Sequence, residues 1–179
     1  MNDMVLSLIL LGNDSQALQL TLEALNYAEK NGWAFEKDNH LLNLGELYRK
    51  SGKYKEALNY FRESKSIYDS IQSKIFSSIT DELLGETFLL LNQSDSALYH
   101  YQQAYKVALQ IGKKPWHRIV ILNGMGFYYY EVDNYDVALD YFRQALSFAT
   151  SYKDLFDTNF NIARVYYQIG QSDSSIIYG

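Results

Sequence analysis

A short sequence pattern returns five times along the chain at nearly constant spacing. Each copy has a polar turn followed by a small residue and an aliphatic residue. Repeats near 40 residues are typical of solenoids and propellers, in which similar units stack in a row or a ring. The 179 residues are therefore expected to form one array of similar units. The small residue is Ala17, Ala57, Ala97, Ala138 and Ser175, so that successive copies lie 40, 40, 41 and 37 residues apart.

The residues that follow each turn favour helices over strands. In the second copy, Ala57, Phe61, Ser64 and Tyr68 are separated by steps of four, three and four residues, which places them on one face of an α-helix. A propeller strand would alternate with a period of two, and none of these segments does. The chain has one proline, which also favours helix. The equivalent rows are Ala17, Thr21, Ala24 and Ala28, then Ala97, Tyr101, Ala104 and Ala108, then Ala138, Phe142, Ala145 and Ala149.

A second pattern precedes each turn, and the two patterns together resemble the signature of the tetratricopeptide repeat family. That signature is W-x2-L-G-x2-Y followed by A-x3-F. The best copy in this chain reads Leu41-x2-Leu44-Gly45-x2-Tyr48 and then Ala57-x3-Phe61, with Leu in place of Trp. The copy from Leu122 to Phe142 matches nearly as well. The resemblance covers essentially the whole chain.

The resemblance implies an all-α fold, a right-handed α-solenoid of stacked antiparallel helix hairpins. The period of about 40 exceeds the 34 residues usual in the family and is similar to its long-repeat type. We expect the extra residues to lengthen both helices of each unit by about one turn. The repeats of this single array are expected at residues 1–32 (partial), 38–72, 75–112, 115–151 and 153–179 (truncated).

Small residues and aromatic residues are expected to have different roles where the helices touch. Gly45, Gly85, Gly126 and Ala163 on the first helices are expected to face Ala57, Ala97, Ala138 and Ser175 on the second, because small side chains let two helices approach closely. The aromatic residues are expected to wedge between hairpins and to supply much of the buried area. This architecture accounts for the 17 tyrosines without a binding function.

The two ends of the chain carry incomplete copies of the pattern. The apolar run from Val5 to Leu11 follows Asn2 and Asp3 rather than basic residues, so it is interpreted as half of a helical hairpin and not as a signal peptide. The last copy stops at Gly179, one or two turns into its second helix. Because terminal repeats normally need a polar capping face, we expect that the chain is a fragment of a longer protein.

Charge and composition exclude several classes of function. The net charge of −5 argues against direct nucleic-acid binding. No cysteine is present, and His40, His100 and His117 lie far apart, so no metal site is expected. The search for phosphate-binding loops, dinucleotide fingerprints and activated serines finds none. We therefore expect no enzymatic activity and no cofactor, and no run approaches the length of a membrane span.

The resemblance implies that the first helices line a concave groove that binds a protein or peptide. We expect the groove to be acidic toward its N-terminal repeats, aromatic and amide-bearing in its middle, and basic at its C-terminal end. This gradient would orient a peptide with its cationic part near the glutamates; the alternative is a set of solvated faces. Leu42 and Glu46 argue against a carboxylate clamp, which uses basic and amide residues there. The candidate contacts are Leu42, Glu46, Arg49, Glu82, Glu86, Asn123, Phe127, Tyr130, Phe160, Arg164 and Tyr167.

These observations lead to two functional hypotheses. The first is the sensing or docking region of a larger signalling or transcriptional regulator, which is an association drawn from the family. The alternative is a stand-alone adaptor or a self-associating scaffold, a homo-oligomer formed through uncapped terminal repeats. We expect a cytoplasmic location, with an extracytoplasmic sensor region as the alternative.

Overall fold

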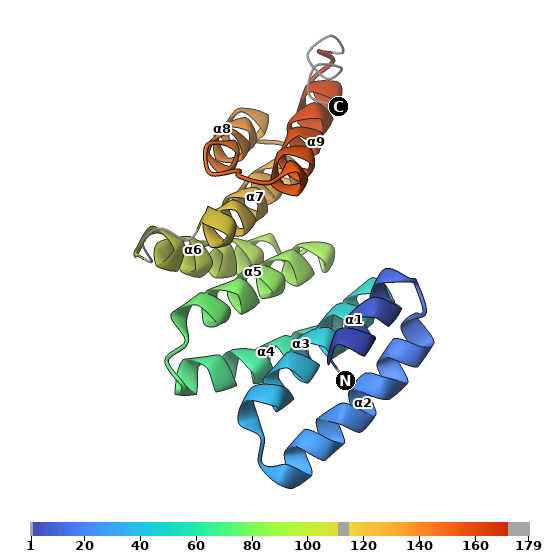
Figure 1. The fold of residues 1–179 in the computed structure, drawn as a ribbon. Coiled ribbons are helices and arrows are strands. Elements are labelled where there is room, and N and C mark those ends of the chain that lie inside the picture. The colour runs from blue at the N-terminus through green and yellow to red at the C-terminus, as the bar shows by residue number, and fades with distance from the viewer. Residues whose placement is uncertain (1, 111–114, 172–179) are drawn as a thin grey trace.

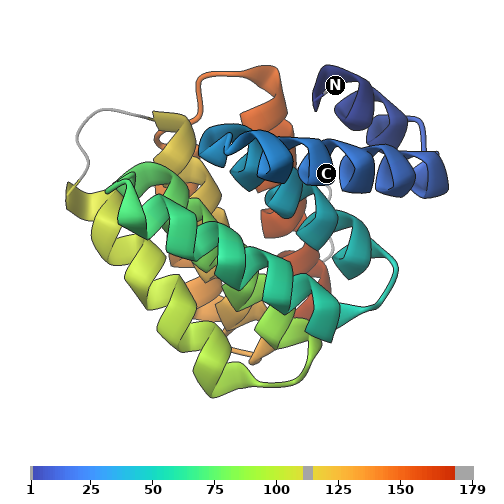
Figure 2. The ribbon, with the colours of Figure 1, turned by 90° about the horizontal axis from the view of Figure 1, so that it is seen from below.

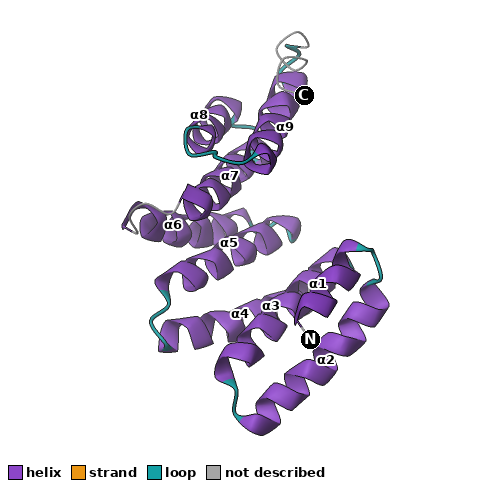
Figure 3. Ribbon diagram, in the orientation of Figure 1, coloured by secondary structure: helices purple, strands orange, loops and turns teal. Residues whose placement is uncertain are grey.

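The computed structural model describes residues 2–110 and 115–171, and these residues form α-helices and no strand (Figure 3). The all-helical prediction is therefore confirmed. Most of the helices are 17 residues long. Their bounds are α1 (Asn2–Leu10), α2 (Asp14–Asn31), α3 (Ala34–Lys50), α4 (Tyr54–Ser70), α5 (Lys74–Leu90), α6 (Ser94–Gln110), α7 (Pro115–Glu131), α8 (Tyr135–Leu146) and α9 (Tyr152–Gln168).

Consecutive helices pair as antiparallel hairpins, and the hairpins stack one after another along the array. Figure 1 shows α1 and α2 at one end, followed by the α3–α4, α5–α6 and α7–α8 pairs and then α9. Each hairpin also packs on the next one through its second helix, since α4 contacts α5 and α6 contacts α7. The chain therefore forms the α-solenoid expected from its repeats.

Most of the turns inside and between hairpins share one backbone geometry. At the α3–α4 turn, Gly52 has a φ of +76°, and the N–H of Lys53 donates to the carbonyl of Tyr48 at 2.9 Å. This six-residue bond is the Schellman motif, which needs a left-handed residue just past the helix end. Asn92 fills the equivalent place in the α5–α6 turn with a φ of +57°. The polar turns recognised in the sequence therefore end one helix and start the next.

The glycines of the first helices make room for aromatic rings. A Cβ atom on Gly45 would lie 2.3 Å from the ring of Phe61, and one on Gly126 would lie 2.5 Å from the ring of Phe142. The sequence predicts that these glycines face the alanines of the second helices. Ala57 is fully buried, but the aromatic ring one turn later is what the glycine meets first. The partner expected for Ala163, Ser175, lies outside the described residues.

The helix expected through Ala149 ends earlier than its sequence pattern indicated. Helix α8 stops at Leu146, and the N–H groups of Phe148 and Ala149 bond to carbonyls three residues back. Such bonds tighten the chain into a turn at the end of a helix. Ser151 forms a capping box with Asp154. The next helix, α9, then begins at Tyr152.

The end segments agree with the sequence in part. The apolar run that begins at Val5 forms α1, in which Val5 is fully buried, so its assignment to a hairpin helix is confirmed. The expected second helix of the last copy, around Ile176, lies outside the described residues.

The array curves toward its odd-numbered helices. Contacts join α1 to α3, α5 to α7, and α7 to α9. No comparable contact joins consecutive even-numbered helices within residues 2–110 and 115–171. The odd-numbered helices are therefore the closer neighbours at three of these junctions, while side chains such as Arg49 and Glu86 join α3 to α5. Figure 2 shows the array from below. We call the surface of α3, α5, α7 and α9 the inner face.

Candidate functional site

The candidate contact residues lie on the four helices of the inner face, and the structure gathers seven of them into two groups. One group lies on α3 and α5, and the other on α7 and α9. Leu42 joins neither, because it is partly buried against the hydrophobic core around Phe61 and Leu84. Part of its side chain packs on this core, and its role as a ligand contact stays a prediction.

The first group consists of three carboxylates around one guanidinium, and we call it the acidic cluster. Nη2 of Arg49 lies 2.8 Å from Oε2 of Glu46, and Nη1 lies 2.8 Å from Oε1 of Glu86. Glu82 lies one turn before Glu86 on α5. The side chains of Glu46 and Glu86 each keep 28% of their surface exposed, so a ligand can reach the cluster from the inner face.

Glu82 carries the strongest electrostatic perturbation of the acidic cluster. Burial raises the pKa of Glu82 to about 8, and the charges of Glu86 and Glu46 add to the rise while Arg49 opposes it. Burial also raises the pKa of Glu86, although the bond from Arg49 works against this. One guanidinium is thus too little positive charge for three carboxylates, and Glu82 is the group that keeps its proton near neutral pH.

Tyr101 of α6 lies on the buried side of the acidic cluster. Its ring passes between α5 and α7, since Cβ atoms on Gly85 and Gly124 would lie 3.1 and 2.9 Å from it. The same point on Gly124 lies 3.2 Å from Oε1 of Glu82. Tyr101 is fully buried, and its hydroxyl has no hydrogen-bond partner among the described residues. Sequence reasoning assigned this tyrosine to packing alone, because it occupies the aromatic position of the A-x3-F pattern.

The second group combines Arg164 of α9 with two aromatic residues of α7. The guanidinium carbon of Arg164 lies 4.7 Å from the ring centre of Tyr130 and 5.7 Å from that of Phe127. Both distances are those of cation–π contacts. We call Phe127, Tyr130 and Arg164 the arginine–aromatic group. The contacts hold the guanidinium over the rings and join α9 to α7.

The remaining candidates differ in how far they are open to solvent. Asn123 donates from Nδ2 to Oγ1 of the buried Thr158 at 3.1 Å, and its Oδ1 has no partner within the described part of the chain. Phe160 stacks on Phe156 with ring centres 6.4 Å apart, and both are exposed. Tyr167 is 74% exposed. The amide therefore joins α7 to α9, and the exposed rings extend the face along α9.

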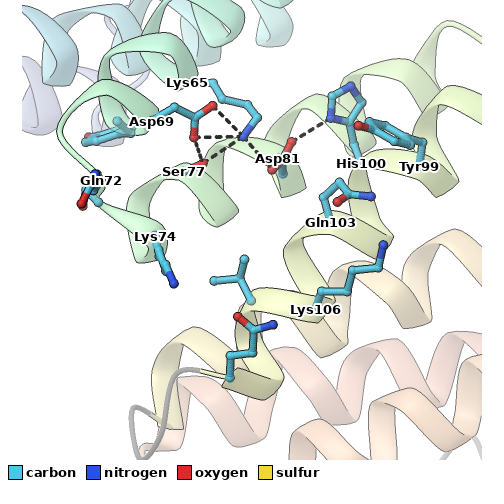
Figure 4. A pocket seen from close by; sticks show the side chains of 14 residues that line it. Lys65, Asp69, Gln72, Lys74, Ser77, Asp81, Tyr99, His100, Gln103 and Lys106 are labelled. Carbon is cyan, nitrogen blue, oxygen red and sulfur yellow. Dashed lines mark hydrogen bonds and ion pairs between the residues drawn. The ribbon is translucent and has the colours of Figure 1, made fainter.

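A separate cleft on the other side of the array was missed by the sequence reasoning. It lies between α4 and α6 over the first half of α5 and has a volume of about 890 Å³. Figure 4 shows Lys65 bonded to Asp69, Ser77 and the buried Asp81, which also accepts from His100 at 2.8 Å. Lys74 and Lys106 lie at its rim (Figure 4). Because the buried charges of this cleft bind one another, they fix the junction of two repeats.

The described residues contain neither a candidate metal-binding group nor a candidate membrane-spanning helix. No group of three or more His, Asp or Glu side chains that could hold a metal ion is found in them. Within residues 2–110 and 115–171, no helix is both long and apolar enough to cross a membrane.

The repeats define a class of protein, the helical-repeat solenoids, and comparison with known families identifies which one. Residues 36–110 and residues 118–151 each match the tetratricopeptide repeat family. The chain therefore belongs to the tetratricopeptide repeat family, as the sequence pattern indicated. No curated protein sequence matches the chain.

Several solved structures share the fold. BtubC (BKLC) from P. vanneervenii is 19% identical with a TM-score of 0.75, over 96% of this chain and 72% of that one. NprR in complex with its cognate peptide NprX is 17% identical with a TM-score of 0.81, over 98% of this chain and 51% of that one. The Rap conjugation gene regulator of the plasmid pLS20, in complex with the Phr peptide, is 18% identical with a TM-score of 0.81, over 97% and 49%. This chain thus spans about half the length of the last two.

Proposed function

We propose that the chain is a non-catalytic scaffold that binds a protein or peptide segment along its inner face. In this proposal the segment lies across α3, α5, α7 and α9, with a cationic residue at the acidic cluster and aromatic or amide groups toward α7 and α9. The scaffold serves as the sensing or docking region of a larger signalling or transcriptional regulator.

The observation that carries the proposal is the unequal charge of the acidic cluster. Glu46, Glu82 and Glu86 share one guanidinium, that of Arg49, so an incoming cation meets carboxylates that are not fully compensated. The arginine–aromatic group places the opposite charge at α9. Two ends of opposite charge on one face give a bound segment a preferred direction.

The middle of the face adds groups suited to a peptide. The Nδ2 atom of Asn123 donates to Thr158, and its Oδ1 atom is buried without a partner among the described residues, so rotation of this side chain toward the face would offer its amide to a backbone group of the ligand. The rings of Phe127 and Phe160 offer apolar anchors, which typically contribute much of the binding energy of a peptide.

The comparisons support the class of partner. NprR and the Rap regulator have this fold, and both were solved with a bound peptide. The Rap protein is described as a gene regulator, which supports the regulatory setting proposed here. Their low identity to this chain carries no information on which peptide it would bind.

A peptide library tests the proposal. We would incubate the purified chain with immobilised, acetylated nine-residue peptides in which each position is varied in turn, and measure the selected peptides by calorimetry. The proposal predicts selection of Lys or Arg at one end and an aromatic residue several positions away. Selection of acidic peptides, or of none, would contradict it.

A variant pair places the binding on the inner face. Glu86→Gln is expected to weaken a selected peptide by about tenfold, since it removes one charge-assisted contact. The same variant should hardly affect a peptide in which norleucine replaces the cationic residue. Glu56→Gln on the exposed start of α4 is the matched control and should bind like the unchanged protein. Equal effects of the two variants would reject the inner face as the site.

A second candidate function, self-association, is favoured by the aromatic surface of α9. Tyr152, Phe156, Phe160 and Tyr167 are 94%, 66%, 52% and 74% exposed, and large exposed apolar patches often mark interfaces. Light scattering at two concentrations tests this function. A mass that grows with concentration and falls in Phe156→Glu would support assembly through α9, whereas a constant monomer mass would exclude it.

A further inference from the structure

The acidic cluster contains one carboxyl group, that of Glu82, to which Arg49 donates no hydrogen bond. Arg49 donates one terminal nitrogen to Glu46 and the other to Glu86. Glu82 is left beside this pair on the same face, partly exposed to solvent. A carboxyl group without an ion-pair partner does not by itself make a binding site, so the groups around Glu82 decide what it can bind.

Tyr101 supplies the second observation. A phenol hydroxyl that is fully buried without a partner is costly, because it has lost its bonds to water. The ε edge of the Tyr101 ring and Oε1 of Glu82 both lie about Gly124, and Glu82 exerts the strongest charge effect on this phenol. Burial and these carboxylates raise the pKa of Tyr101 well above its usual value, so the phenol stays a hydrogen-bond donor. The hydroxyl makes no hydrogen bond to Glu82 in this structure, and an ionised Glu82 is the neighbouring charge that would accept its proton most strongly.

We propose that Glu82 is a docking point for one ammonium or guanidinium group of a bound peptide. The cation approaches from the exposed side of α5, where Glu46 and Glu86 share its charge. Tyr101 acts as a positioning residue that donates to the Glu82 carboxylate from the buried side. This inference rests on the proposed peptide-binding function and names the cation subsite within it.

The charged groups around Glu82 set the direction of the pH dependence. Glu46 and Arg49 face it from α3, Glu86 from its own helix and Tyr101 from α6, and Glu131 of α7 acts on Tyr101. Because the pKa of Glu82 is about 8 in the free protein, a cation that needs its ionised form must displace a proton below that pH. Affinity should therefore rise by up to roughly tenfold per pH unit below pH 8 and level off above it.

Carbon-13 NMR of glutamate side chains in the whole chain tests the subsite. The probes are acetyl-Ala-Ala-Lys-Ala-Ala-amide, its arginine analogue and its norleucine analogue, with the Glu82 signal assigned through Glu82→Gln. The titration midpoint of Glu82 should fall when the lysine or arginine peptide is added and stay in place with the norleucine peptide. A midpoint that does not move while the cationic peptides bind elsewhere would overturn the subsite.

Variants separate the subsite from the proposed function. Glu82→Gln should remove the pH dependence of binding between pH 6.5 and pH 8.5, and Tyr101→Phe should raise the Glu82 midpoint in the bound state. Glu56→Gln should leave both unchanged. If library-selected peptides bind Glu82→Gln with the pH dependence of the unchanged protein, the subsite is wrong and peptide binding stands. If no peptide binds at any pH, both fall.

Discussion

Arg49 and Glu86 join two successive repeats across the inner face, with Nη1 of the arginine 2.8 Å from Oε1 of the glutamate. The residues are 37 positions apart, and their helices α3 and α5 belong to different hairpins. The contact couples the packing of the repeats to the charge of the proposed binding face. Changes at these positions should therefore affect both stability and binding.

Replacing Arg49 by methionine should destabilise the array. Glu46 and Glu86 would lose their cation, and unpaired, partly buried carboxylates cost about 1–3 kcal/mol. The loss in the free energy of unfolding, measured with urea, should be larger at pH 8 than at pH 5, because protonation relieves the repulsion. Arg143→Met is the matched control, since Arg143 is exposed, with Nη1 3.7 Å from Asp140 and Nη2 2.9 Å from the Tyr166 hydroxyl; such exposed contacts contribute little. Equal losses for both variants would refute the role of Arg49.

Replacing Glu82 by glutamine should stabilise the protein at high pH. The folded pKa of Glu82 is about 8, against an ordinary value of 4.5. The folded state keeps the proton that the unfolded chain releases, so the unchanged protein loses stability as pH rises from about 4.5 to about 8. Glutamine carries no such charge. Because Glu82 is partly exposed, the gain should reach about 1–3 kcal/mol above pH 8 and vanish near pH 4.5.

Thermal melts of both proteins from pH 4.5 to pH 9 measure this difference. A melting-temperature gap that widens with pH supports the raised pKa of Glu82. A gap that is constant with pH would mean that Glu82 titrates normally.

Two glycine substitutions should differ according to the space beside each glycine. A Cβ on Gly45 would lie 2.3 Å from the Phe61 ring, whereas one on Gly85 would lie 3.1 Å from the Tyr101 ring. Alanine gains about 1 kcal/mol of helix propensity over glycine, but overpacking costs about 1–3 kcal/mol. Gly45→Ala should therefore destabilise the protein, and Gly85→Ala should be close to neutral. Urea unfolding checks the order, and combining Gly45→Ala with Phe61→Leu should recover part of the loss.

The fold could be predicted from the sequence because each repeat contains its own turn residues and its own helical rows of small and aromatic residues. Turn residues such as Gly52 and rows of small and aromatic residues such as Ala57 and Phe61 depend only on neighbours in the chain. The early end of α8 could not be predicted in this way, because the row through Ala149 keeps helical spacing although the helix ends at Leu146.

The candidate site was predictable in composition but not in contacts. The family pattern placed Glu46, Glu82 and Glu86 on one face. It could not show that Arg49 reaches from α3 to α5, because that depends on the crossing of two hairpins. Nor could it reveal the unsatisfied hydroxyl of Tyr101, since burial and partners are properties of the packed array. The arginine–aromatic contacts of Arg164 arise in the same way.

Mapping a bound peptide on the array tests the central claim most directly. A library-selected peptide would carry a nitroxide label beside its lysine or, in a second sample, beside its aromatic residue, and amide signals of the nitrogen-15-labelled chain would report the broadening. We predict broadening around Glu46 and Glu82 from the first label and around Phe127 and Arg164 from the second. Broadening centred on Lys65 and Lys106 in the cleft between α4 and α6 would contradict the assignment of the inner face as the binding surface.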